Sequence, residues 1–111
     1  MATIVSSTNN LSLHSILEKD KLTGKNFLDW ERNLQIVLRH ERKWYVLEEP
    51  LEEAPPANAT AVVRNAYQRR SNDSLDVSCL MLATMNPELQ TSMMDIGAYD
   101  MIRQLRAMFK E

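Results

Sequence analysis

Glycine is scarce in this sequence, and its scarcity limits the folds that the chain can adopt. Only two of the 111 residues are glycine, whereas an average protein has about 7%. Four prolines add little further capacity for tight turns. Sandwiches and barrels of β-strands need many such turns, so we predict an all-α fold. The expected architecture is a compact bundle of about five helices.

Charge and cysteine content exclude several classes of protein. Thirteen Lys and Arg against 15 Asp and Glu give a net charge of −2, which argues against non-specific nucleic-acid binding by the whole domain. The single cysteine, Cys79, can form neither an internal disulfide nor a Cys-rich zinc site. We also find no apolar run long enough to span a membrane and no signal peptide. A reducing intracellular setting and no membrane partner are therefore expected.

Apolar spacing divides the chain into helical segments. Residues 1–10 are rich in Ser, Thr and Asn and are predicted to form a flexible arm. Residues 11–111 are predicted to form a single helical domain, because neither half has enough apolar residues to fold alone. An acidic, proline-rich connection at 48–59 joins the halves. Helices are predicted at 12–19, 27–43, 61–85, 87–96 and 98–109, with a short apolar segment at 44–47 that suits a helical turn or a strand.

The long helix at 61–85 changes character along its length. Its first half is polar, with Val63, Ala66 and Tyr67 as the predicted buried stripe. Its second half, from Leu75 onward, is apolar nearly all round, which is typical of a helix inside a bundle or at an interface.

Four residues mark the expected helix ends. Asn26, Thr60 and Asn86 are predicted to cap the helices that follow them. Gly97 is predicted to end the helix before it in a left-handed conformation.

The residue types that perform catalysis do not gather into a site. His14 and His40 lie far apart in the sequence, and neither has a second ligand at metal-binding spacing. Cys79 falls in the most apolar segment, where a thiol is usually buried and inert. The glutamates of the 48–59 connection suit solvated charge better than acid–base catalysis. We therefore predict no enzyme activity, no metal, no cofactor and no small-molecule substrate.

A mixture of basic and aromatic residues at 39–45 allows two interpretations. It suits a contact with single-stranded nucleic acid, but it better suits a helix C-terminus with packed aromatic rings. The candidates for weak RNA contact are Arg39, Arg42, Lys43 and Arg64.

One spacing pattern is specific enough to suggest a family. It reads Leu22-x-Gly24-x-Asn26-Phe27-x-x-Trp30-x-x-x-Leu34-x-x-x-Leu38, followed by Trp44-x-x-Leu47. The pattern resembles the N-terminal Gag region of copia-type LTR retrotransposons, particularly those of plants, and the resemblance covers about residues 10–110. Leu105 matches the Leu of a family pattern Ala-x-x-x-Trp-x-x-Leu that begins at Ala98. Two positions depart from the family: Tyr67 and Ile102 stand where it commonly has Trp.

The resemblance implies a structural role. It implies a helical domain similar to a retroviral capsid N-terminal domain, which would self-associate into cytoplasmic virus-like particles around the element's RNA. Family members usually contact RNA through a zinc knuckle or basic tail further downstream, so this chain resembles the N-terminal half of a longer Gag. Asn26, Phe27, Trp30, Leu34, Leu38, Trp44 and Leu105 would form the family core. The candidates for self-association are Met101, Leu105, Met108 and Phe109.

A second interpretation starts from the methionines. Seven are many for this length, and methionine suits adaptable binding surfaces as well as cores. The chain could be a domesticated or stand-alone adaptor that binds a partner helix or peptide in a Met-lined groove. It could also interfere with the assembly of related capsids.

Overall fold

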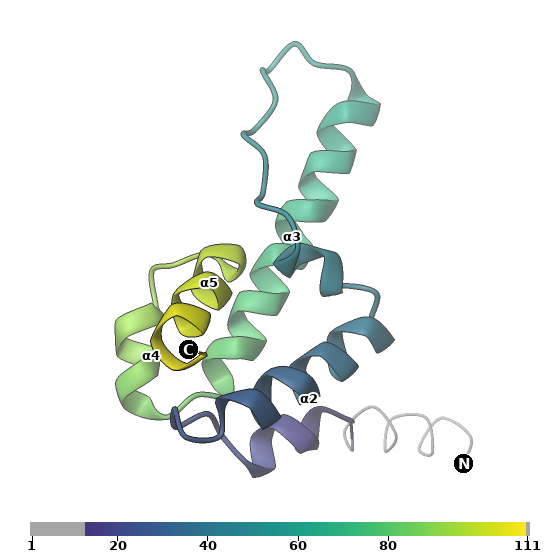
Figure 1. The fold of residues 1–111 in the computed structure, drawn as a ribbon. Coiled ribbons are helices and arrows are strands. Elements are labelled where there is room, and N and C mark those ends of the chain that lie inside the picture. The colour runs from purple at the N-terminus through teal and green to yellow at the C-terminus, as the bar shows by residue number, and fades with distance from the viewer. Residues whose placement is uncertain (1–12, 111) are drawn as a thin grey trace, which may run out of the picture.

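A computed structural model describes residues 13–110, and they form α-helices joined by loops (Figure 1). The prediction of an all-α fold is confirmed. The predicted arm at 1–10 lies outside the described residues. The elements are a helix at 13–19, α2 (Phe27–His40), the 3-10 helix η1 (Trp44–Leu47), α3 (Ala61–Ala83), α4 (Pro87–Met93) and α5 (Ala98–Phe109).

One hydrophobic core joins all of these elements. Both α2 and α5 are strongly amphipathic. Each contributes one apolar stripe to the core, which also contains Val77 and Met81 from the second half of α3. The largest side chains in the core are almost fully enclosed by protein: Trp30, Phe27, Leu17, Leu22, Leu34, Leu38, Met81, Met85, Met93, Met101, Ile102 and Leu105.

A backbone bridge fixes the start of α2 to the far end of α3. The Leu22 amide donates a hydrogen bond of 2.8 Å to the Thr84 carbonyl, and the Asn86 amide donates one of 2.9 Å to the Leu22 carbonyl. This isolated parallel bridge between Leu22 and Met85 was not predicted, because two-residue pairing leaves no periodic pattern in a sequence.

The turn before α2 is closed by Asn26, although not as predicted. Asn26 occupies the N-cap position, but its side chain makes no capping hydrogen bond to α2. Instead, its Oδ1 accepts from the Thr23 amide at 3.0 Å, and its Nδ2 donates to the Lys21 carbonyl at 2.9 Å. Gly24 adopts φ +113, and the ring of Phe109 lies against it. A side chain at position 24 would collide with that ring.

The end of α2 is a Schellman motif built without glycine. The Arg42 amide donates to the Arg39 carbonyl at 3.1 Å, and the Lys43 amide donates to the Leu38 carbonyl at 2.8 Å. Arg42 has φ +62, a left-handed conformation that costs a non-glycine residue about 1–2 kcal/mol. The motif ends α2 earlier than predicted and turns the chain into η1.

The long helix α3 supports only part of the prediction for it. Thr60 caps it as expected, since its Oγ1 accepts from the Val63 amide at 3.3 Å. Val77 and Met81 are its buried residues, whereas Leu75 is 62% exposed and Cys79 is also exposed. The prediction of a buried Cys79 is therefore wrong, and so is the alternative that places this half of the helix inside a bundle. The alternative that it lies at an interface stays a prediction. The other helices cover one face of α3 and leave the opposite face open.

The first half of α3 extends beyond the helical body, with the connection from η1 beside it (Figure 1). Val63 is 49% exposed, and Ala66 and Tyr67 are half-buried. The predicted buried stripe is thus only partly covered. An ion pair between Arg70 and Glu52 links the connection to the helix.

The short segment between α4 and α5 ends at Gly97. Asn86 caps α4 as predicted, because its Oδ1 accepts from the Leu89 amide at 2.9 Å. Gly97 has φ −70 and ψ 162 and occupies the N-cap position of α5. The predicted left-handed stop is therefore wrong, since α4 ends at Met93 and an extended Gly97 begins the next helix.

Candidate interaction surface

The residues of the family signature lie together in the core. Phe27, Trp30, Leu34 and Leu38 have exposed fractions of 0–1%, and Leu105 reaches the same core from α5. Trp44 is partly buried against it. Trp30 also donates from Nε1 to the buried Thr84 hydroxyl at 3.1 Å. These residues hold the body together, so an interaction surface has to lie elsewhere.

The predicted self-association residues do not share a surface. Met101 and Leu105 are completely buried. The Phe109 ring packs on Phe27, with 5.9 Å between their centroids, and Met108 alone is substantially exposed, at 50%. Helical spacing grouped the four correctly on one side of α5, but that side faces the core. In this fold Met101 and Leu105 are not available for the predicted contact, whereas a contact through Met108 stays a prediction.

The predicted RNA-contacting residues do not form one basic patch. Lys43 donates from Nζ to Oδ2 of Asp76 at 3.0 Å, which pairs its charge within the chain. Arg39 and Arg42 are exposed at the end of α2. Arg64 precedes Asp76 by 12 positions on α3, about 18 Å along a helix axis. Weak RNA contact by these residues remains a prediction.

Two polar pairs join η1 and its flank to α3. The Tyr45 hydroxyl donates to Oδ2 of Asp73 at 2.6 Å. Burial and this hydrogen bond to a carboxylate raise the pKa of Tyr45 to about 12. The hydrogen bond to Asp76 likewise raises the pKa of Lys43 above its ordinary 10.5. Both pairs stabilise the contact between η1 and α3 in their protonated forms.

These pKa shifts predict a loss of stability in alkali. The unfolded chain releases the Tyr45 proton near pH 10.0, whereas the folded chain holds it to about pH 12. The contribution is complete below pH 10 and is lost as pH rises toward 12. We expect the free energy of unfolding, measured in urea, to fall less steeply over this range in Tyr45→Phe. The contribution of Lys43 is present in the original chain and in Tyr45→Phe. If the free energy of unfolding fell equally steeply with pH in both, the role assigned to Tyr45 would be contradicted.

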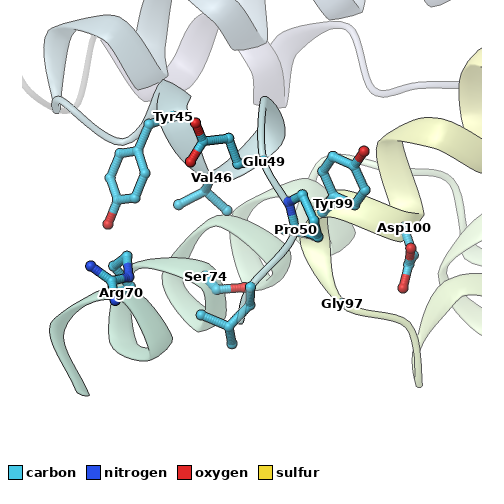
Figure 2. A pocket seen from close by; sticks show the side chains of 11 residues that line it. Tyr45, Val46, Glu49, Pro50, Arg70, Ser74, Gly97, Tyr99 and Asp100 are labelled. Atoms are coloured by element: carbon cyan, nitrogen blue, oxygen red, sulfur yellow. The ribbon is translucent and has the colours of Figure 1, made fainter. Parts of the chain in front are cut away.

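A small pocket lies between η1, the connection, α3 and the start of α5 (Figure 2). Figure 2 shows Tyr45 and Arg70 on one side of it, and Tyr99 and Asp100 on the other. Its volume is about 200 Å³, below the roughly 300–1,000 Å³ of ordinary ligand sites. Arg70, a basic residue in its lining, already forms an ion pair with Glu52. The lining residues are Tyr45, Val46, Glu49, Pro50, Leu51, Arg70, Ser74, Gly97, Ala98, Tyr99 and Asp100.

A charge cluster around the buried carboxylate of Glu31 joins α2 to α5. Glu31 is 8% exposed. Its carboxylate accepts from Nε of Arg106 at 2.6 Å and from Nζ of Lys110 at 3.2 Å. The sequence analysis did not single out these residues. Arg106 and Lys110 are four positions apart and thus share a helix face, but only the packing of α5 on α2 gives them a common partner.

One further pair of titratable side chains, outside this cluster, involves a histidine. His14 pairs with Glu41 through Nε2 and Oε2, and His14 lies near the end of α2. Among residues 13–110, no three His, Cys, Asp or Glu side chains are grouped to hold a metal ion. No helix in that range is long and apolar enough to cross a membrane.

Comparison with known proteins adds no relative to this picture. The chain matches no protein-family model, no curated protein and no solved structure.

Proposed function

We propose that this chain is a structural, non-catalytic domain that associates with copies of itself. The proposed type is the N-terminal Gag domain of a copia-type retrotransposon, which assembles into cytoplasmic virus-like particles around the element's RNA. In this proposal, the protein–protein contacts are individually weak. Repetition of many such contacts makes the assembly stable.

The proposal is supported by the way the signature residues are used. Trp30, Phe27 and Leu34 are among the most enclosed side chains of the body. The glycine, Gly24, and the asparagine, Asn26, of the same pattern shape the turn that leads into α2. These five positions of the motif therefore have structural tasks, although Asn26 closes the turn before α2 instead of capping the helix.

The observation that carries self-association is the unfinished packing of α3. Its apolar face is used by the body at Val77 and Met81. The same helix continues beyond the body and leaves Val62 78% exposed and Val63 49% exposed. Adjacent exposed apolar residues on a projecting helix are typical of a protein-binding surface.

Sedimentation provides the direct test. We expect the 111-residue chain to show reversible self-association between micromolar and millimolar concentrations in analytical ultracentrifugation. The weight-average mass should rise smoothly above 12.8 kDa with concentration. A constant monomer mass up to millimolar protein would overturn the proposal.

Sequencing the transcript beyond codon 111 provides a second test, which concerns the Gag assignment. If that assignment is right, we expect an open reading frame that leads to a zinc knuckle.

The adaptor interpretation has less structural support. Four of the methionines that would line its groove are at most 2% exposed: Met81, Met85, Met93 and Met101. They fill the core between α3, α4 and α5, so they are not available to bind a peptide. Met94 and Met108 are exposed but lie on different helices.

A further inference from the structure

We propose that the projecting arm pairs with the same arm of a second copy about a two-fold axis. The arm consists of residues 61–70 of α3 and the connection 48–60 beside it (Figure 1). This inference rests on the proposed function and specifies the surface and the geometry of the contact. The partner is a second copy of this chain.

The arm has an apolar face that the monomer covers only in part. A shallow groove of about 250 Å³ lies between α3 and the connection, and Val62, Val63, Ala66 and Tyr67 line its helix side. On a helix, Val63, Ala66 and Tyr67 share a face with Arg70, Val77 and Met81, and Val62 lies at the edge of that face. The arm therefore continues the apolar stripe of the core, but only the connection covers it. A second arm would supply the missing helix surface.

The charges of the arm are complementary to those of an identical arm. The connection contains Glu48, Glu49, Glu52 and Glu53, while residues 61–70 contain Arg64, Arg69 and Arg70. Within residues 13–110, only Glu52 and Arg70 of this set form an ion pair. The other members leave one acidic segment and one basic segment side by side.

Two-fold symmetry matches these segments without any further partner. In a two-fold contact, every pair of contacting residues occurs twice. If residue i of one copy contacts residue j of the other, then residue j of the first copy contacts residue i of the second. Arg69 follows Val62 by seven positions and lies on the same side of α3, and Glu53 lines the groove. With the arms antiparallel, Arg69 of each copy approaches Glu53 of the other while the valines meet between them. A partner of different sequence would not supply both of these reciprocal Arg–Glu pairs.

The size of the arm sets the expected affinity. Ten residues of helix span about 15 Å, so the contact is smaller than the roughly 1,200–2,000 Å² of a stable complex. We expect a dissociation constant on the order of 100 μM, which suits a contact that is repeated many times in an assembly.

The apolar part is tested with Val62→Asp in the 111-residue chain. Val62 is 78% exposed and lies in the first turn of α3, where an acidic residue favours the helix, so the variant should fold normally by circular dichroism. Sedimentation equilibrium should show dimerisation weakened roughly hundredfold, since two valines are lost per dimer. Leu75→Asp is the matched control: Leu75 is 62% exposed on the same helix but outside the arm. It should leave the dissociation constant within about threefold.

The electrostatic part is tested by a charge exchange. Glu53→Arg alone should weaken dimerisation about tenfold, because two symmetric ion pairs become repulsions. Glu53→Arg combined with Arg69→Glu should restore the affinity to within about threefold of the original chain. A combined variant as weak as the single one would overturn the antiparallel two-fold arrangement.

The outcomes separate this inference from the proposed function. If the chain dimerises but Leu75→Asp rather than Val62→Asp weakens it, another surface is used and the arm proposal is wrong, while self-association stands. If the unaltered chain stays monomeric to millimolar concentration, both proposals fail. If it binds only an unrelated apolar peptide at the arm, the adaptor interpretation replaces both.

Discussion

Trp30→Ala is expected to lower the free energy of unfolding by about 3–5 kcal/mol. The indole is 1% exposed, packs 6.1 Å from the Phe27 ring between centroids and donates to the Thr84 hydroxyl. Its removal leaves a large cavity between α2 and the end of α3. Since small domains have only about 5–15 kcal/mol of stability, the variant should be close to unfolding at ambient temperature.

Guanidinium unfolding followed by circular dichroism measures this loss. Trp30→Phe is the matched control, because it keeps an aromatic ring in the core while it removes the indole N–H and part of the fused ring system. The Thr84 hydroxyl still donates to the carbonyls of Leu80 and Met81 at 3.0 Å, so it is not left unpaired. We expect Trp30→Phe to cost less than half as much as Trp30→Ala. Equal costs would mean that the hydrogen bond, rather than packing, dominates at this position.

Leu105→Ala and Met108→Ala should differ strongly although they lie one turn apart on α5. Leu105 is fully buried, and Met108 is 50% exposed. We expect Leu105→Ala to cost about 2–5 kcal/mol and Met108→Ala less than about 0.5 kcal/mol. Thermal and guanidinium unfolding of the two variants would measure both values.

This pair also distinguishes a core from an interface. If Leu105 were mainly a self-association residue, its replacement would change the dissociation constant and leave monomer stability nearly unaltered. The structure requires the opposite result. A stable Leu105→Ala monomer with weakened dimerisation would therefore contradict the packing of α5 on α2 and α3.

The helices of this protein follow from local rules, so the sequence predicts them well. Thr60 and Asn86 cap the helices that follow them because a short polar side chain reaches the free amides of a first turn. The apolar spacing of α2 predicts its buried face, from Phe27 to Leu38. The extent of α5 was also predicted, because its amphipathic period is strong.

Local rules failed at three turns, where the observed conformation or hydrogen bonds differ from the ones that residue type alone predicts. Asn26 has a good capping side chain, but the Lys21 carbonyl and the Thr23 amide use it instead. Gly97 was expected to adopt a left-handed conformation, yet it is extended and occupies the N-cap position of α5. The left-handed end of α2 falls on Arg42, which no glycine rule identifies.

The candidate surface could be predicted only in part. The sequence shows that Val63, Ala66 and Tyr67 form an apolar face, and it shows the acidic connection before them. It does not show how far the body extends along α3. That limit depends on where α5 and η1 cross the helix, and it leaves the upper part of the apolar face open.

The sequence by itself determined the all-α class, the Thr60 and Asn86 caps and the apolar faces of α2 and α5, because these depend on residues within a few positions of one another. The tertiary structure alone decided which faces remain open. It buried Met101 and Leu105, exposed Leu75 and Cys79, and joined Glu31 to Arg106 and Lys110. Periodicity gives the direction of an apolar stripe along a helix, whereas burial depends on the neighbouring elements that long-range packing brings against it.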